Sequence, residues 1–289
     1  MAKCLITKLK GVVEDTSFMK LGELRFKVHA DSSKVLYIAP KAGTSIVLTI
    51  IDGNATFDSG AIQATINATT TIKVTGDCTI SVDNKYNLAE FRAQSGFQVD
   101  MDIEQLEYSH DLTRFQNVGY GLAIHGKFSK LPSSLTSLIC YGSKDLEIDD
   151  VNLPNLTTLN LNYGDSYMTA PEFMAKLPSI TSFYLYGSAA APVVKGSIDG
   201  FANLPSSFYT KVQNIRFGNL YLISGDIAAF SKFTNLETLY LSYCQNLKGD
   251  LSSLIGFKNC EINIANTAIT WSQSTIDTMV ANGCTIIVI

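Results

Sequence analysis

The chain has 289 residues, of which 46% are hydrophobic, so it is long enough to bury a sizeable core in one large domain or two smaller ones. Its 22 basic and 26 acidic residues give a net charge of −4, and lysine and arginine form no cluster. This composition predicts a soluble globular protein. It argues against binding to nucleic acids or to anionic membranes.

The first 21 residues are moderately apolar and too short to form a domain. Lys8, Lys10, Glu14 and Asp15 interrupt this segment before the apolar centre of a signal peptide can form. The rest of the sequence contains no apolar run long enough to span a bilayer, so membrane insertion is not expected. We interpret residues 1–21 as an attachment or oligomerisation segment.

Residues 22–95 are predicted to form a small β-domain. The runs ELRFKVHA, KVLYIAP, TSIVLTII, TTTIKVT and CTISV are rich in β-branched and aromatic residues. Glycine, aspartate, asparagine and serine separate these runs, as is typical of turns between short strands.

No motif for metal binding or catalysis stands out. His29, His110 and His125 lie in separate elements, without the H-x-x-x-H or H-E-x-x-H spacing of a zinc site. The acidic stretches VDMDIEQLE and DLEIDDVN alternate with aliphatic residues, which is typical of the solvent face of a strand and not of a calcium-binding loop. The third glycine of GYGLAIHG is misplaced for a dinucleotide-binding loop. We therefore predict no catalytic residue, metal or cofactor, and no enzyme activity.

The six cysteines are predicted to be reduced thiols in the core. They include no C-x-x-C pair, and four of them replace aliphatic residues within apolar patterns. They are Cys4, Cys78, Cys140, Cys244, Cys260 and Cys284.

The second part of the sequence repeats itself. The segment LTSLICYGS, which begins at Leu135, recurs as LTTLNLNYG, ITSFYLYGS, VQNIRFGNL and LETLYLSYC, and more loosely as NCEINIANT and GCTIIVI. The second apolar position falls at 138, 159, 183, 215, 239, 262 and 286, so the intervals are 21, 24, 32, 24, 23 and 24 residues. A period of this length predicts a solenoid, with an insertion in the longest interval.

This pattern resembles the leucine-rich repeat family, L-x-x-L-x-L-x-x-N/C-x-L, most specifically between Gly196 and Ile269. The segments GSIDGFANL, GDIAAFSKFTNL and GDLSSLIGF share G-[SD]-[IL], which resembles the turn and second short strand before the convex helix of that family. The resemblance implies an α+β repeat fold, in which the small β-domain (22–95) precedes a solenoid (96–289) with a parallel sheet on its concave face. An asparagine ladder is not expected, because the usual asparagine position holds Ser143, Gly164, Ser188, Leu220, Cys244 and Thr267.

The residues that point out of the predicted parallel sheet form a candidate binding surface. In L-x-L the two leucines point into the core, and stacked repeats place the intervening residues on one face. Tyrosine offers contact area with a polar tip, and asparagine and arginine offer directional hydrogen bonds. The alternative is that these tyrosines only favour the strand conformation. The candidate residues are Tyr141, Asn160, Asn162, Tyr184, Tyr186, Arg216, Tyr240 and Asn263.

The last repeat is predicted to end in a helix and an uncovered strand. Ser272 can cap the helix, Ile276, Met279 and Val280 would give it one apolar face, and Gly283 can close it. An open apolar strand edge pairs with other chains, so we predict a homo-oligomer, a dimer or a trimer. The alternative is that the chain covers this edge itself. The predicted interface strand is Ile286, Ile287, Val288 and Ile289.

The functional prediction comes from the order of the segments along the chain. This order resembles that of leucine-rich repeat proteins of gut Bacteroidetes and their crAss-like phages. The segments are the N-terminal segment, the β-region ending in DNKYNLAEF, the repeats with G-D-[IL] turns and the ending MVANGCTIIVI. The resemblance implies a non-enzymatic virion protein, a head fibre or similar decoration, that is assembled in the host cytoplasm and anchored by its N-terminus. Its partners would be capsid proteins, a host surface protein or a glycan. The alternatives are a bacterial cell-surface adhesin and an intracellular protein-binding adaptor.

Overall fold

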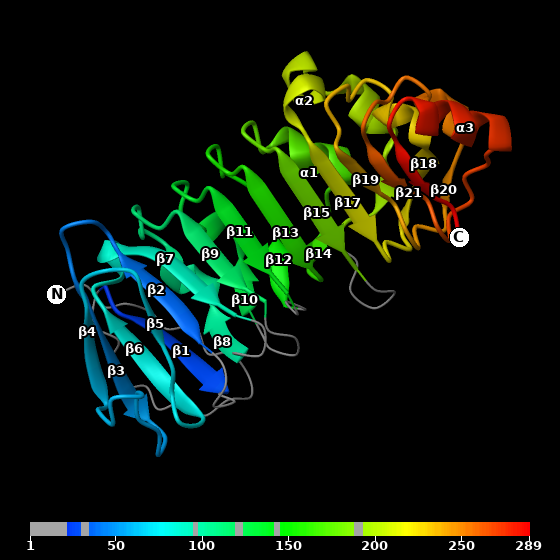
Figure 1. Ribbon diagram of the computed structural model, residues 1–289. Helices are drawn as coiled ribbons and strands as arrows, with labels where there is room; N and C mark the ends of the chain where they lie inside the picture. The colour runs from blue at the N-terminus through cyan, green and yellow to red at the C-terminus, as the bar shows by residue number, and fades with distance from the viewer. Residues whose placement is uncertain (1–21, 30–34, 95–97, 119–123, 142–144, 188–192) are drawn as a thin grey trace.

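The computed structural model describes residues 22–29, 35–94, 98–118, 124–141, 145–187 and 193–289. The predicted attachment segment 1–21 lies outside the described residues, as do Cys4, Ser143 and Ser188. The chain is mostly β-structure, with the strands set side by side in one long row (Figure 1). No helix in the described ranges combines the length and the apolar composition needed to cross a bilayer.

The N-terminal strands predicted from the sequence are confirmed. In β1 inward residues alternate with outward ones, so every second residue from Leu24 is buried. β2 and β6 each bury three consecutive residues as well. The sequence patterns did not indicate β4 and β7. The strands are β1 (Leu24–His29), β2 (Leu36–Pro40), β3 (Ile46–Asp52), β4 (Gln63–Ile66), β5 (Thr70–Ile72), β6 (Cys78–Asp83) and β7 (Leu88–Ala93).

Every predicted repeat contributes one strand to an eleven-stranded sheet, here called the long sheet. Its strand order is β22-β21-β19-β17-β15-β13-β11-β9-β7-β2-β5, and the pairs from β7 to β22 are parallel. The repeat solenoid is therefore confirmed. Its strands are β9 (Arg114–Asn117), β11 (Ser137–Cys140), β13 (Thr158–Asn162), β15 (Ser182–Tyr186), β17 (Asn214–Gly218), β19 (Thr238–Tyr240), β21 (Glu261–Asn263) and β22 (Thr285–Ile287).

A second layer of short strands faces the long sheet. An eight-stranded sheet has the order β14-β12-β10-β8-β1-β6-β3-β4, and a three-stranded sheet has the order β16-β18-β20. Both layers continue from the N-terminal strands into the repeats, because β7 pairs with β9 and β1 pairs with β8. Hydrogen bonds therefore cross the predicted domain boundary at residue 95. The division into two domains stays a prediction. The added strands are β8 (Gln98–Asp102), β10 (Ile124–Lys127), β12 (Leu146–Ile148), β14 (Asp165–Ser166), β16 (Gly196–Ser197), β18 (Ile223–Asp226) and β20 (Leu247–Lys248).

Helical structure is scarcer than the predicted α+β class implies. Several repeats form a short 3₁₀ helix where an α-helix was expected. The described α-helices are α1 (Ala170–Ala175), α2 (Ser206–Lys211) and α3 (Gln273–Ala281). The 3₁₀ helices are η1 (Lys85–Asn87), η2 (Ile103–Leu106), η3 (Phe128–Lys130), η4 (Asp199–Asn203), η5 (Ile227–Phe230) and η6 (Leu251–Leu254).

The core between the layers is continuous and rich in phenylalanine. Phe91 packs edge-on against Phe26, with ring centroids 5.1 Å apart, and stacks on Phe115 at 5.4 Å. These contacts join the N-terminal strands to the first strand of the repeats. The cysteines in the described ranges are all buried and free, which confirms the predicted core thiols.

Hydroxyl and amide side chains link neighbouring repeats in place of the usual asparagine ladder. The hydroxyl groups of Thr136, Thr157 and Thr181 each donate to the backbone carbonyl of the preceding repeat, at 3.0, 2.9 and 3.0 Å. At the usual asparagine position, the Sγ atom of Cys244 donates to the carbonyl of Phe217 at 3.7 Å. Asparagines at other positions also bond to the preceding repeat; they are Asn155, Asn235, Asn246 and Asn282.

The G-D motif has a clear structural reason. Gly225 and Gly249 have φ angles of +122° and +107°, and a Cβ atom on Gly249 would lie 2.3 Å from Asp226 Oδ1. Asp226 accepts a hydrogen bond from the backbone N–H of Ala228 at 2.9 Å, which caps η5. The backbone N–H of Asp226 in turn donates to Asp199 of the preceding repeat. Glycine is needed because the next repeat passes directly over this capping carboxylate.

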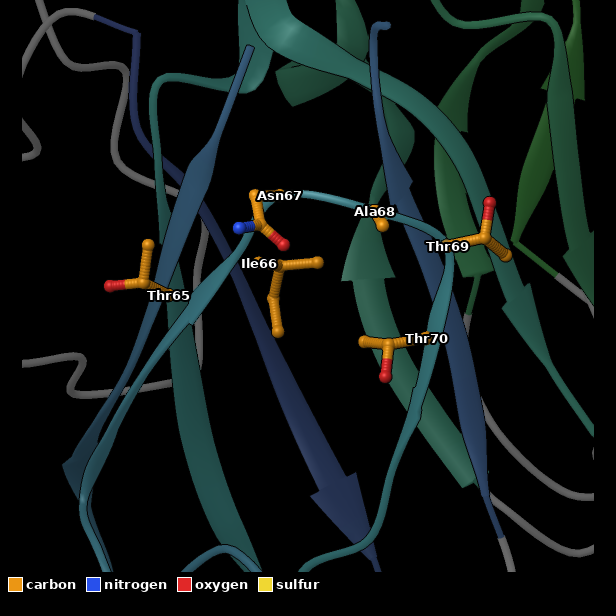
Figure 2. A pocket seen from close by; sticks show the side chains of 6 residues that line it. All are labelled: Thr65, Ile66, Asn67, Ala68, Thr69 and Thr70. Atoms are coloured by element: carbon orange, nitrogen blue, oxygen red, sulfur yellow. The ribbon is translucent and has the colours of Figure 1, made fainter. Parts of the chain in front are cut away.

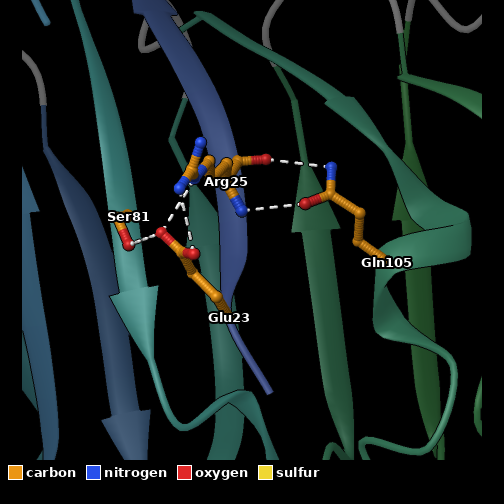
Figure 3. Close-up of polar contacts among 4 residues, drawn as sticks. All are labelled: Glu23, Arg25, Ser81 and Gln105. Carbon is orange, nitrogen blue, oxygen red and sulfur yellow. Dashed lines mark hydrogen bonds and ion pairs between the residues drawn. The ribbon is translucent and has the colours of Figure 1, made fainter. Parts of the chain in front are cut away.

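The N-terminal part also contains two polar features. Residues 65–70, at the turn between β4 and β5, line a hollow with threonine, asparagine and small apolar side chains (Figure 2). Figure 3 shows a network in which Glu23 binds the Arg25 guanidinium at 2.8 Å and accepts from the Ser81 hydroxyl. The side-chain amide of Gln105 bonds to both the backbone N–H and the carbonyl of Arg25. This network ties β1 and β6 to η2 at the start of the repeats.

The C-terminal helix matches its prediction except at one position. Ser272 caps α3 by accepting from the Thr275 N–H, and Gly283 closes it with φ +84°. Met279 is fully buried, but Val280 is 53% exposed, so the prediction that Val280 lies on the apolar face is wrong. The buried stripe of α3 is centred on Thr275 and Met279, and the next residue is rotated by about 100° away from it.

Candidate binding surface

The outer face of the long sheet carries an unbroken row of register partners, here called the middle row. It crosses from the N-terminal strand β2 to the last strand β22, and from Tyr37 to Asn263 each position has buried residues on either side. From β2 to β22 the middle row is Tyr37, Arg92, Gln116, Ile139, Asn160, Tyr184, Arg216, Tyr240, Asn263 and Ile287.

The structure brings the predicted surface residues onto this one face. The middle row contains Asn160, Tyr184, Arg216, Tyr240 and Asn263. The other three predicted residues, Tyr141, Asn162 and Tyr186, lie two residues further along the chain than the middle-row residues Ile139, Asn160 and Tyr184. Asn162 pairs with Tyr186 in the register, and the Tyr141 hydroxyl accepts a hydrogen bond from the Asn160 amide at 3.0 Å.

Arg216 sits between two tyrosine rings at the centre of the predicted surface. Its guanidinium carbon lies 5.3 Å from the ring centroid of Tyr184 and 4.5 Å from that of Tyr240. Such cation–π contacts fix a guanidinium group while leaving its edge free to donate hydrogen bonds. The Tyr240 hydroxyl donates to Glu261, and burial followed by this bond raises the pKa of Tyr240. The two tyrosine rings therefore hold Arg216 in place.

Tyr186 packs beside this cluster because the neighbouring strand has a glycine. A Cβ atom on Gly218 would lie 2.6 Å from the ring of Tyr186. Gly218 is the register partner of Tyr186, so the missing side chain makes room for the tyrosine ring. Burial raises the pKa of Tyr186, while the positive charge of Arg216 opposes that rise.

Three polar atoms of the predicted surface residues are buried and have no hydrogen-bond partner among the described residues. They are Asn160 Oδ1, Asn162 Oδ1 and Arg216 Nε, on strands β13 and β17, which lie on either side of β15. Most buried polar atoms in folded proteins are paired, so each exception needs an explanation such as a water molecule or a ligand. The face therefore keeps unused capacity for hydrogen bonds.

The N-terminal end of the middle row was not predicted from the sequence. There the Arg92 guanidinium lies 5.0 Å from the ring of Tyr37 and pairs with Glu90 at 3.0 Å. The outward positions of Tyr37 and Arg92 follow from the alternation in their strands. Their alignment with the repeats does not, because β2 and β7 lack the repeat motif that fixes the register of the other strands.

Other candidate chemistry is dispersed. His29 pairs with Asp77 at 3.0 Å, and His125 lies 3.7 Å from Asp100 in a different part of the eight-stranded sheet. Across the part of the chain that the structure describes, no group of three or more His, Cys, Asp or Glu side chains could hold a metal ion. The residues that line the hollow in Figure 2 carry no titratable group.

The last strand forms one edge of the long sheet. β22 pairs with β21, and its other side has no strand partner among the described residues. Ile286 is partly buried against the core, whereas Ile287 and Ile289 are 36% and 98% exposed. Trp271 and Val280 add exposed apolar area in the same last repeat.

No protein-family model matches the sequence, and no curated protein matches it. Among solved structures, the chain is similar to the plant peptide hormone receptor RGFR1 in complex with RGF2, with 16% sequence identity and a TM-score of 0.35. The likeness covers 64% of this chain and 37% of the receptor chain. A likeness at this level carries no argument about binding, and the repeat fold rests on the strand register given above.

Proposed function

We propose that this chain is a non-enzymatic binding protein that holds its partner against the outer face of the long sheet. The observation that carries the proposal is the position of Arg216 between Tyr184 and Tyr240 on the middle row. Tyrosine and arginine are enriched among the few residues that dominate the binding free energy at protein interfaces. Side chains that are already fixed lose little conformational entropy when a partner binds.

The partner proposed for this face is a protein. The face is part of a continuous sheet, and small molecules bind instead in concave pockets that bury most of their surface. A glycan is the alternative partner, because the amide groups of Asn160, Asn162 and Asn263 can hydrogen-bond to sugar hydroxyls.

The test compares the parent chain with the double variant Tyr184→Ala/Tyr240→Ala, using a randomised peptide display library and a glycan array as probes. Each true anchor should contribute about 1–3 kcal/mol to binding. The melting temperature should change little, because neither ring belongs to the core. Tyr167→Ala is the matched control, since Tyr167 is 80% exposed and follows β14 of the opposite sheet. Equal binding by the parent and the double variant would refute the proposal.

The finer proposal is that the chain is a virion component, a head fibre or similar decoration, attached through residues 1–21. Its support is the resemblance of the segment order to leucine-rich repeat proteins of gut Bacteroidetes and their crAss-like phages. The alternatives are a cell-surface adhesin and an intracellular adaptor of the same repeat type.

Mass spectrometry of purified phage particles tests this finer proposal. The chain should be present in the particles. A variant that starts at Gly22 should keep the circular dichroism spectrum of the parent and be absent from the particles. Incorporation of the shortened variant at the parent level would exclude residues 1–21 as the attachment segment.

We also propose that the chain forms a homo-oligomer, a dimer or a trimer, through the open edge of β22. This proposal is supported by two exposed apolar residues, Ile287 on the edge strand β22 and Ile289 just beyond it. Unpaired strand edges offer backbone N–H and C=O groups to another chain.

A further inference from the structure

Two tyrosines occupy backbone positions that normally favour glycine or asparagine. Tyr163 and Tyr243 have φ angles of +72° and +61°, in the left-handed region. Asn219 and Asn266 hold the same position in other repeats, with φ angles of +55° and +56°. Side chains other than asparagine, aspartate and glycine rarely adopt this conformation.

The turn itself does not need tyrosine. The backbone N–H groups of Tyr163, Asn219 and Tyr243 make the same bond to the next repeat, at 2.9, 3.2 and 2.9 Å. Asparagine therefore forms this turn as well as tyrosine does. Neither tyrosine belongs to the hydrophobic core, and Tyr243 is 47% exposed. A strained residue that the fold does not need indicates a functional role.

Both tyrosines flank Arg216 at the edge of the candidate surface. Tyr163 follows β13 and Tyr243 follows the β19 strand, on opposite sides of β17, which carries Arg216. At about 4.8 Å per strand, the lateral separations from Arg216 are roughly 10 Å and 5 Å. Both tyrosines also lie three residues beyond the register row of Arg216, which adds roughly 10 Å along the strands. A partner segment of several residues can therefore reach all three side chains.

The charge of this region indicates the chemistry of the partner. No ion pair joins Arg216 to a carboxylate within the described ranges, whereas Arg92 is paired with Glu90. The nearby Glu261 already accepts from Tyr240. Arginine binds carboxylates through two parallel hydrogen bonds. The two tyrosine rings cover the faces of the Arg216 guanidinium, so a carboxylate would bind at its edge, where Tyr186 also makes a side-chain hydrogen bond.

We propose that an acidic polypeptide segment binds here, with a carboxylate on Arg216 and neighbouring side chains on Tyr163 and Tyr243. This inference rests on the proposed function and adds the class of partner and two residues of the site. A polypeptide is favoured over an acidic sugar because the tyrosine faces nearest the cation are occupied by Arg216. A sugar ring would need such a face for stacking.

The experiment uses the full chain and a randomised peptide display library as the probe. Enriched peptides should contain more Asp and Glu than the input library. The best peptide should bind Arg216→Gln and Tyr163→Asn/Tyr243→Asn at least about tenfold more weakly than the parent. Its affinity for the parent should fall as salt is raised. The double asparagine variant should melt at or above the parent temperature, since asparagine suits this conformation better.

Tyr108→Asn is the matched control. Tyr108 has φ +68° and is 59% exposed, but it follows η2 and lies outside the long sheet. The control should gain the same stability and keep the parent affinity. Enriched peptides without an excess of acidic residues, or equal affinity of the double asparagine variant, would overturn the inference. If a glycan instead binds and the Tyr184→Ala/Tyr240→Ala variant loses it, the proposed function stands and this inference fails.

Discussion

Replacing Gly249 by alanine should destabilise the chain more than any ordinary surface change. The new Cβ atom would lie 2.3 Å from Asp226 Oδ1, so the carboxylate that caps η5 must move. Loss of such a cap costs about 1 kcal/mol. The φ angle of +107° adds about 1–3 kcal/mol of backbone strain for alanine. The sum of about 2–4 kcal/mol corresponds to a fall of the melting temperature on the order of 5–10 °C.

Thermal and urea unfolding, followed by circular dichroism, measure this effect against two glycine controls. Gly60 has φ +78° and no atom within 4 Å of an added Cβ, so Gly60→Ala isolates the strain and should cost about 1 kcal/mol. Gly256 is equally open and has no positive φ, so Gly256→Ala should be neutral or stabilise by about 0.5 kcal/mol. If Gly249→Ala loses no more stability than Gly60→Ala, the capping contact between repeats contributes nothing.

Three further outcomes follow from the structure. Light scattering should show an oligomer for the parent and a smaller species for Ile287→Lys; a monomeric parent at micromolar concentration would exclude the β22 edge as an interface. Burial raises the pKa of Cys140 and raises that of Cys244 to about 12. Mass spectrometry after alkylation should therefore find both thiols unmodified until the chain unfolds. Equal alkylation with and without urea would contradict their burial. Burial also raises the pKa of Tyr186 and Tyr240 above the ordinary 10.0, so the unfolded chain loses these protons at a lower pH than the folded chain does. The free energy of unfolding should therefore fall as the pH rises above 10.0. In Tyr186→Phe this fall should be smaller, and an unchanged fall would argue against a raised pKa at Tyr186.

The repeats could be predicted from the sequence because their periodicity fixes both the strands and their alignment. Once Leu159, Phe183 and Ile215 are equivalent positions, the parallel register and the outward neighbours follow. This is why Tyr184 and Arg216 could be placed on one face without a structure.

Features that depend on contacts between non-equivalent segments could not be predicted. Arg92 joins the middle row only because β7 pairs with β9, and neither strand carries the full repeat motif. The left-handed conformation of Tyr163 could not be predicted from the sequence. Glycine, asparagine and aspartate normally indicate this conformation, and tyrosine does not. Val280 shows the limit of helical periodicity, since a short helix packed by one narrow stripe leaves adjacent apolar residues exposed.

Hydroxyl-radical footprinting of the tyrosine side chains tests the central claim most directly, because it locates the bound partner on the surface. The probe is the tightest-binding peptide or glycan from the display panels, and modification of each tyrosine is measured by mass spectrometry with and without it. Binding at the outer face of the long sheet predicts that Tyr184 and Tyr240 become protected while Tyr108 and Tyr167 keep their reactivity. Protection of Tyr108 or Tyr167, with Tyr184 and Tyr240 unchanged, would contradict the claim that this face is the binding surface.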